Sequence, residues 1–199
     1  MHPNPIFRST DHSRFEALIR EVAFGMVFLT TPDGPTVAHI PLLSNGNGEM
    51  RFHLAKSNAL APYLDGAKAL ITVNGPDGYV SPRWYDNRDT VPTWDYVTLE
   101  MEGTVERLCD KQLEQLLLDV IETFEGRLDG DAWSATESSP KVWSALFKGI
   151  TGFSMNVDQW RPTFKLSQKK NEAERKRIAD GVELTGNSEL ARWMRDISQ

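Results

Sequence analysis

A series of short β-rich segments joined by tight-turn residues fills the first half of the chain and constrains its fold most. Residues 26–31, 36–42 and 50–55 are rich in apolar and β-branched side chains. Asp33-Gly34 separates the first two segments, and residues 45–48, with the sequence Asn-Gly-Asn-Gly, separate the second from the third. Such turn residues favour hairpins between antiparallel strands. The sequence therefore predicts a set of neighbouring strands connected by tight hairpins.

Three more strands are predicted farther along the chain. Residues 69–74 and 79–84 are two β-rich runs divided by residues 75–78, with the sequence Gly-Pro-Asp-Gly, which favours a turn. Residues 94–108 predict a long strand, in which Gly103 is expected to mark a bend or bulge. Because an open sheet leaves edges exposed, short antiparallel strands of this kind usually close into a barrel or pack as a sandwich.

Helical patterns begin before the strands and dominate the chain after them. Apolar residues recur at helical spacing over 15–22 and, most clearly, over 113–124. Ser139-Pro140 is typical of an N-cap and first turn, and residues 188–195 predict a short final helix. Residues 153–157 supply a last strand. We therefore predict an α+β protein with a six- or seven-stranded antiparallel β-barrel and flanking helices.

The length of 199 residues suits a single domain over residues 1–199, in which residues 165–199 form a charged helical C-terminal extension. The formal net charge of −6 opposes binding to a polyphosphate backbone. The basic residues of the extension are interrupted by Glu172 and Glu174, which is typical of a solvated helix face. We find no basic recognition helix, so direct nucleic-acid binding is not expected.

The single cysteine, Cys109, has no partner for an intramolecular disulfide or a thiolate metal site and suits a reducing compartment. No apolar run approaches about 18 residues, and the N-terminus lacks the pattern of an export signal. The chain is therefore expected to be cytoplasmic, without a membrane span. The four histidines, His2, His12, His39 and His53, show no metal-ligand spacing, and no metal is predicted.

Common catalytic signatures are missing, including a dinucleotide-binding glycine loop, a P-loop, a zinc-binding H-E-x-x-H and a G-x-S-x-G elbow. Five segments in order resemble instead the successive motifs of the PaiB-like family, named FMN-binding negative transcriptional regulators. The resemblance runs from about Phe24 to Lys170, and its segments are TVAHIPL (36–42), FHLAKSN (52–58), GYVSPRWY (78–85), VPTWDY (91–96) and FKLSQK (164–169).

This resemblance implies a split β-barrel related to pyridoxamine phosphate oxidases and flavin reductases. It also implies a homodimer with FMN in a cleft at the subunit interface. The phosphate of FMN is a dianion, and Lys56, Ser57 and Asn58 offer a cation and donors just after the strand that carries His53. A plain polar turn is the alternative interpretation of these three residues.

The flavin ring needs a flat slot with backbone donors and acceptors. The resemblance assigns this role to the backbone around Ala38, His39 and Ile40, and it assigns closure of the cleft to three aromatic residues, Trp84, Trp94 and Tyr96. Packing in a core is the alternative for these aromatic side chains.

The closing motif supplies two further candidates, Lys165 and Gln168, which suit a phosphate or a polar edge of the ligand. Residues 129–139 and 156–163 depart from the family pattern and leave the geometry around Lys165 open.

The first functional hypothesis is an FMN-binding protein that acts as a flavin-dependent oxidoreductase or as a sensor of flavin or redox state. His39, His53 and Tyr96 are candidate proton donors, but none is identified as a catalytic acid or base, so enzymatic activity is left open. The alternative is a negative transcriptional regulator that acts on DNA or through a protein partner without catalysis. Haem binding is a minor third hypothesis, because no histidine follows His53.

Overall fold

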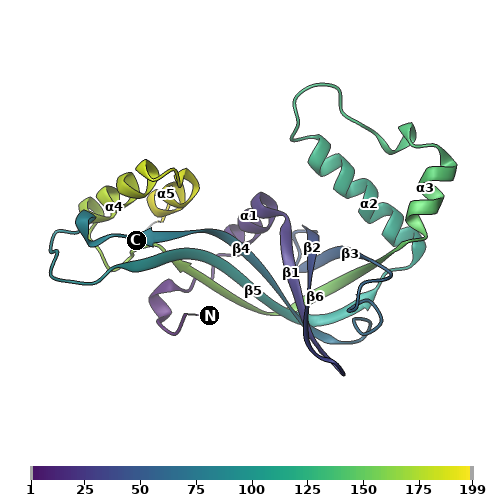
Figure 1. Ribbon diagram of the computed structural model, residues 1–199, viewed down its shortest axis with the longest axis horizontal. Coiled ribbons are helices and arrows are strands. Elements are labelled where there is room, and N and C mark those ends of the chain that lie inside the picture. The colour runs from purple at the N-terminus through teal and green to yellow at the C-terminus, as the bar shows by residue number, and fades with distance from the viewer. Residues whose placement is uncertain (1, 198–199) are drawn as a thin grey trace. The chain divides into compact units, whose positions relative to one another are not determined.

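The computed structural model describes residues 2–197 and confirms the predicted α+β class with six antiparallel strands (Figure 1). The ends of the predicted 1–199 domain and 165–199 extension, residues 1 and 198–199, lie outside the described residues. The strands are β1 (Phe24–Thr31), β2 (Gly34–Ser44), β3 (Glu49–Ala55), β4 (Lys68–Val80), β5 (Thr93–Arg107) and β6 (Ile150–Lys165). The α-helices are α1 (His12–Val22), α2 (Asp110–Glu125), α3 (Pro140–Phe147), α4 (Glu172–Leu184) and α5 (Ser188–Arg195), and the 3₁₀ turns are η1 (Pro5–Phe7), η2 (Pro82–Trp84) and η3 (Ala135–Glu137).

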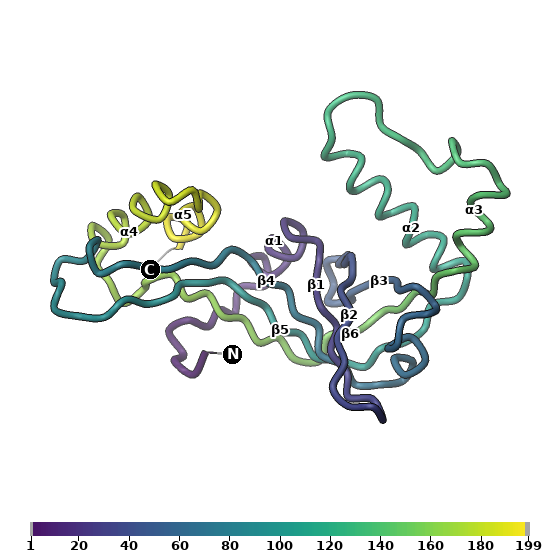
Figure 2. The backbone as a smooth tube through the Cα atoms, viewed as in Figure 1, coloured from purple at the N-terminus to yellow at the C-terminus, as the bar shows by residue number. Residues whose placement is uncertain are grey.

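The strands close into a barrel in the order β1-β2-β3-β6-β5-β4. Figure 2 traces the chain from β1 through a two-residue turn into β2, where Thr31 pairs with Gly34. Gly34 has a φ of 109°, which glycine adopts without the steric cost that a side chain would add. The predicted hairpin at Asp33-Gly34 is therefore confirmed, and alternation along the strands sends Met50, Phe52 and Leu54 into the core.

The turn predicted at residues 75–78 is wrong, because β4 runs without interruption from Lys68 to Val80. Gly78 serves a close approach of α5 instead: a Cβ there would lie 2.9 Å from Leu190 and 3.0 Å from Asn187. The Asn187 side chain also donates a hydrogen bond to the carbonyl of Asp77. A contact with residues more than one hundred positions away thus explains the glycine. The strand predicted over 69–74 runs on into the one predicted over 79–84, but it ends at Val80, and residues 82–84 form η2 instead of a strand.

The strand predicted over 153–157 is also longer than expected, since β6 continues to Lys165 through the residues that depart from the family pattern. Gly103 lies within the continuous strand β5. Its position allows a close backbone approach, because a Cβ at Gly103 would clash with the carbonyl oxygen of Asn156 on β6.

The β1–β2 hairpin is attached to the rest of the barrel by two short ladders. Met26–Phe28 of β1 pair with residues 70–72 of β4, and Leu42–Ser44 of β2 pair with residues 50–52 of β3. The next residue of β2 beyond the second ladder is Pro41, which has no N–H to donate to β3. We call the open stretch beyond Leu42 and Phe52 the β2–β3 seam.

The chain divides into two compact units. The barrel unit comprises residues 16–72 and 101–160, and its centre includes Phe52 and Phe153, whose rings are 5.6 Å apart. The terminal unit comprises Met1–Phe15, Val73–Glu100 and Arg161–Gln199. In the terminal unit, α4 and α5 lie side by side (Figure 1).

The terminal unit has an aromatic core of its own. The Phe164 ring lies 6.2 Å from that of Phe15 and 5.6 Å from that of Trp193. Asn171 and Asn187 cap α4 and α5 through their side-chain oxygens, which satisfy N–H groups of the first helical turns. Across residues 2–197, none of the helices has the length and apolar character needed to cross a bilayer.

Candidate functional site

The β2–β3 seam exposes the backbone of His39. The N–H of Leu42 donates a 3.0 Å hydrogen bond to the carbonyl of Ala23, toward β1. Backbone groups alternate along a strand, so those of Ala38 and Ile40 also face β1, whereas the N–H and carbonyl of His39 face the seam. The side chains of Ala38 and Ile40 are buried in the barrel. His39 is thus the predicted ring-binding residue that offers both a backbone donor and an acceptor at an open edge.

The side chain of His39 lies on the outer surface of the barrel. Its ring stacks on that of Phe24 at 6.4 Å and an interplanar angle of 22°. Met26 lies between His39 on β2 and Thr72 on β4 in the strand register. The hydroxyl of Thr72 is buried and has no hydrogen-bond partner among the described residues. A buried polar atom without a partner is uncommon in proteins, so this surface has unused hydrogen-bonding capacity.

The turn after β3 presents the predicted phosphate ligands. The Lys56 N–H donates to the distant carbonyl of Gly149, and the Asn58 N–H donates to the nearby carbonyl of Ala55. Asn58 Oδ1 accepts the N–H of Leu60 at 2.9 Å. These bonds order the turn but leave the exposed Lys56 ammonium, the Ser57 hydroxyl and the Asn58 amide donor unused within residues 2–197. One cation and two neutral donors beside an open strand edge fit a phosphate dianion.

His53 lies on the outer side of β3, where it pairs with Gly152. A Cβ on Gly152 would come within 2.9 Å of Leu113 and 3.1 Å of Leu108, so leucine side chains cover this part of the sheet. The Nδ1 atom of His53 is buried without a partner among the described residues. Burial lowers the pKa of His53 below its ordinary value of 6.5, which favours the neutral imidazole.

We expect His53 to make stability depend on pH below about 6.5. A lowered folded-state pKa means that the unfolded chain binds more protons in this range, so the free energy of unfolding falls as the pH falls through it. Replacing His53→Gln should flatten that fall in urea titrations between about pH 5 and 7. His12→Gln, on the exposed first turn of α1, is the matched control. An unchanged pH slope in His53→Gln would contradict the assignment.

The predicted aromatic residues gather in the terminal unit. Trp84 and Trp94 line a pocket of about 660 Å³ together with Tyr79 and Arg83. Trp94 is 52% exposed, and its indole N–H donates a 2.8 Å hydrogen bond to Asp77. These two tryptophan side chains therefore border a cavity instead of filling a dry core.

Trp84 has a defined place in this pocket. Its indole packs against Gly181 of α4 so closely that a Cβ at that position would clash with the ring. Tyr96 does not line this pocket, and burial raises its pKa, with a smaller contribution from Glu100. A role of these aromatic residues in closing a flavin cleft stays a prediction.

The closing motif makes internal contacts. Lys165 Nζ donates to Thr93 Oγ1 at 2.6 Å, to the Trp94 carbonyl and to Asp95 Oδ1 at 3.2 Å. Gln168 accepts the N–H of Leu166 at 2.7 Å and donates to the Phe164 carbonyl. Lys165 thus joins β6 to β5, and Gln168 holds the turn after β6 against the end of that strand. The ligand role of both residues stays a prediction.

Asp95 and Ser167 belong to the family motifs VPTWDY (91–96) and FKLSQK (164–169), but they were not among the predicted site residues. Asp95 is 1% exposed and accepts a 2.5 Å hydrogen bond from the Ser167 hydroxyl. Burial raises the pKa of Asp95, and Ser167 and Lys165 oppose that rise. Because Asp95 and Ser167 are 72 positions apart in the sequence, their hydrogen bond could not be predicted from it. We refer to Asp95, Lys165 and Ser167 as the closing cluster.

Several basic side chains of the C-terminal helices and of the turn before α4 are engaged with carboxylates. Lys170 pairs with Glu174 at 2.8 Å, and Arg177 pairs with Asp86. Arg195 contacts both Asp180 and Glu183. These cations are already neutralised, which reduces their availability to a phosphate backbone.

Comparisons with known proteins place the chain in a family. Residues 1–159 match the family described as "Putative FMN-binding domain". The chain is 28% identical over 198 residues to the "Protease synthase and sporulation protein PAI 2" of Bacillus subtilis, with 96% of this chain and 94% of that protein covered.

Solved structures show the same fold at low sequence identity. The FAD and haem binding protein of Mycobacterium smegmatis has a TM-score of 0.61 at 19% identity, over 87% of this chain and 79% of that one. The flavocytochrome Anf3 of Azotobacter vinelandii has a TM-score of 0.64 at 13% identity, over 87% of this chain and 77% of that one. The match to the FMN-binding family supports FMN as the cofactor. The chain belongs to the PaiB-like family of FMN-binding split-barrel proteins.

Proposed function

We propose that the protein is a homodimeric flavoprotein that holds FMN at the β2–β3 seam and works as a flavin-dependent oxidoreductase. The observation that carries this proposal is the open backbone edge of His39, which faces the strand that leads into the Lys56-Ser57-Asn58 turn. The edge supplies a donor and an acceptor for the pyrimidine side of a flavin, and the turn supplies a cation and donors for its phosphate.

Bound FMN supplies the capacity to accept and pass on electrons, and the protein supplies binding and orientation. Lys56, Ser57 and Asn58 anchor the anionic end. Neutral His53 adds no positive charge near the seam, because burial favours its unprotonated form. The exposed His39 ring, stacked on Phe24, offers a flat surface beside the open edge.

The proposed dimer rests on the outer surface of the β1–β2 hairpin. Phe24, Phe28 and Val37 are 51%, 36% and 41% exposed there, and Phe28 pairs directly with Val37. Exposed apolar side chains gathered on one strand pair favour association, and a second copy of the chain is the partner that the family resemblance implies.

Val37→Lys should therefore shift the protein from dimer to monomer and weaken FMN retention. A lysine ammonium at the centre of an apolar interface would be desolvated without a partner of opposite charge, which disfavours association. Sedimentation velocity of the FMN-loaded protein measures the change. Val142→Lys is the matched control, because Val142 is an exposed valine on α3. A Val37→Lys variant that sediments as the wild type does would contradict this interface.

The redox function is tested by mixing the FMN-loaded protein anaerobically with NADH or NADPH and following the flavin absorbance. Bleaching faster than that of free FMN under the same conditions supports the oxidoreductase. Retention of FMN without accelerated reduction would contradict nicotinamide-dependent catalysis and favour a flavin-sensing regulator.

A further inference from the structure

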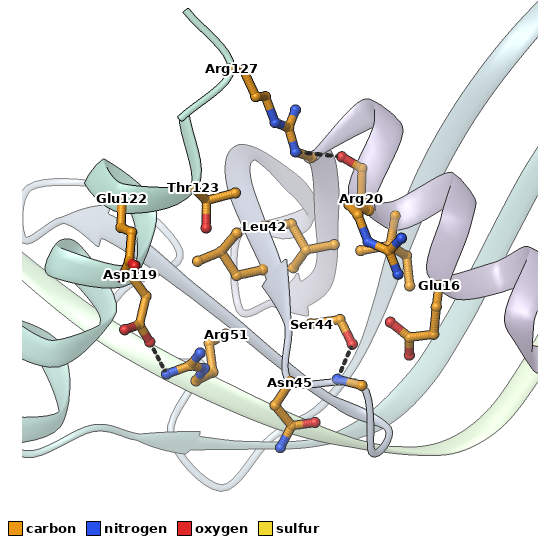
Figure 3. A pocket seen from close by; sticks show the side chains of 14 residues that line it. Glu16, Arg20, Leu42, Ser44, Asn45, Arg51, Asp119, Glu122, Thr123 and Arg127 are labelled. Atoms are coloured by element: carbon orange, nitrogen blue, oxygen red, sulfur yellow. Dashed lines mark hydrogen bonds and ion pairs between the residues drawn. The ribbon is translucent and has the colours of Figure 1, made fainter. Parts of the chain in front are cut away.

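The barrel unit contains a pocket near the end of β2. It has a volume of about 460 Å³ and lies between α1, the end of β2 with the following turn, β3 and α2 (Figure 3). None of the predicted flavin ligands lines it. The volume is in the range of pockets that hold small metabolites.

The walls of this pocket carry charged groups from two helices around an apolar centre. Figure 3 shows Glu16 and Arg20 on α1 at one side, Glu122 on α2 at the other, and Leu42 between them. Ile19 contributes to the apolar wall beside Leu42. The pocket therefore suits a ligand with an alkyl chain that lies against the apolar centre and charged groups that reach the two sides.

Part of the charge in the pocket is already compensated. Arg51 forms a 2.8 Å ion pair with Asp119. Arg127 donates a 2.7 Å hydrogen bond to the backbone carbonyl of Arg20 and lies over the Phe124 ring. These contacts hold the walls in place. The Arg20 guanidinium takes part in none of them.

The remaining charged side chains have no such compensation. Glu16, Arg20 and Glu122 make no side-chain hydrogen bond or ion pair with any part of the chain that the structure describes. The Nε atom of Arg51 is, in addition, buried without a partner among residues 2–197. The pocket thus offers two unpaired carboxylates, one unpaired guanidinium and an unused buried donor, which calls for a ligand or ordered water.

We propose that this pocket binds a small amino acid with a basic side chain. Its carboxylate would pair with Arg20, since guanidinium and carboxylate form strong charge-assisted hydrogen bonds. Its two ammonium groups would pair with Glu16 and Glu122, and its methylene chain would lie along Leu42. The net charge of such a ligand, +1, offsets the −1 of the three unpaired side chains. Acidic metabolites meet two carboxylates here and are disfavoured.

Calorimetric titration tests this proposal with L-lysine, L-norleucine and 1,5-diaminopentane. Norleucine lacks the side-chain ammonium, and diaminopentane lacks the carboxylate. We expect L-lysine to bind and each analogue to bind at least about tenfold more weakly, because each loses one charge-assisted contact. The full chain is titrated both with and without FMN, so the result does not depend on the proposed flavin function.

Arg20→Gln and Glu122→Gln should each weaken L-lysine binding by about tenfold or more. Glu114→Gln, on the same helix but outside the pocket, is the matched control and should bind as the wild type does. Circular dichroism checks that the variants are folded. Undetectable L-lysine binding, an analogue that binds as tightly as L-lysine, or pocket variants that match Glu114→Gln would each overturn the proposal.

Discussion

Replacing Lys56→Gln should weaken FMN binding by about 10- to 100-fold. Lys56 is the exposed cation of the turn after β3, and its ammonium makes no hydrogen bond or ion pair within the described residues. Hydrogen bonds to charged groups contribute about 1.5–3 kcal/mol, and glutamine keeps a donor but removes the charge opposite the phosphate. Titration of the apo protein with FMN, followed by quenching of flavin fluorescence, measures the dissociation constant directly.

A matched control separates the phosphate contact from a general change in surface charge. Lys141→Gln removes an exposed lysine from the first turn of α3 and should leave FMN affinity unchanged. The affinity of the wild type should also fall with added salt more steeply than that of Lys56→Gln. Equal FMN affinity for Lys56→Gln and Lys141→Gln would exclude Lys56 as a phosphate ligand.

The second large effect is expected from the closing cluster. Asp95→Ala should lower the free energy of unfolding by about 3 kcal/mol at pH 7. The substitution removes the acceptor of the Ser167 hydroxyl and the carboxylate beside Lys165, whose side chain is only 13% exposed. Without Asp95, the largely buried Lys165 ammonium keeps only two neutral acceptors, the Thr93 hydroxyl and the Trp94 carbonyl. Leaving a buried charge without its ion-pair partner is destabilising. Urea denaturation followed by circular dichroism gives the difference.

Two further variants define that result. Asp129→Ala removes an exposed carboxylate after α2 and should change stability by less than about 0.5 kcal/mol. Asp95→Asn keeps the size and one acceptor and should lie between the wild type and Asp95→Ala. If Asp95→Ala were as stable as Asp129→Ala, the closing cluster would not support the terminal unit.

The sequence predicted the parts of the fold that depend on local chemistry. The turn at Asp33-Gly34 and the N-cap at Ser139 follow from residues adjacent in the chain, and both were found as expected. The turn predicted at residues 75–78 was wrong because a Gly-Pro-Asp-Gly run has the composition of a turn, whereas here it continues β4. Gly78 is needed because Leu190 of α5 packs closely against it. The pattern of residues in a short stretch of sequence does not reveal such a distant contact.

In the candidate site, too, features set by adjacent residues could be predicted, whereas features set by distant contacts could not. Lys56, Ser57 and Asn58 were predicted from the family motif that contains them and from their side-chain chemistry, and the structure places them in one turn with unused donors. The Lys165 ammonium was predicted to be available to a ligand, yet it lies 3.2 Å from Asp95, 70 positions away. Pro41 marks the seam in the sequence, but its effect on the ladder becomes evident only once the register with β3 is known.

The central claim, that FMN is held by the dimeric barrel, is tested most directly by gel filtration of the protein after incubation with FMN, with light scattering and visible absorbance recorded together. We predict flavin absorbance that elutes with a dimer and persists through the column. Elution of a colourless protein, with FMN recovered in the small-molecule fraction, would contradict the claim.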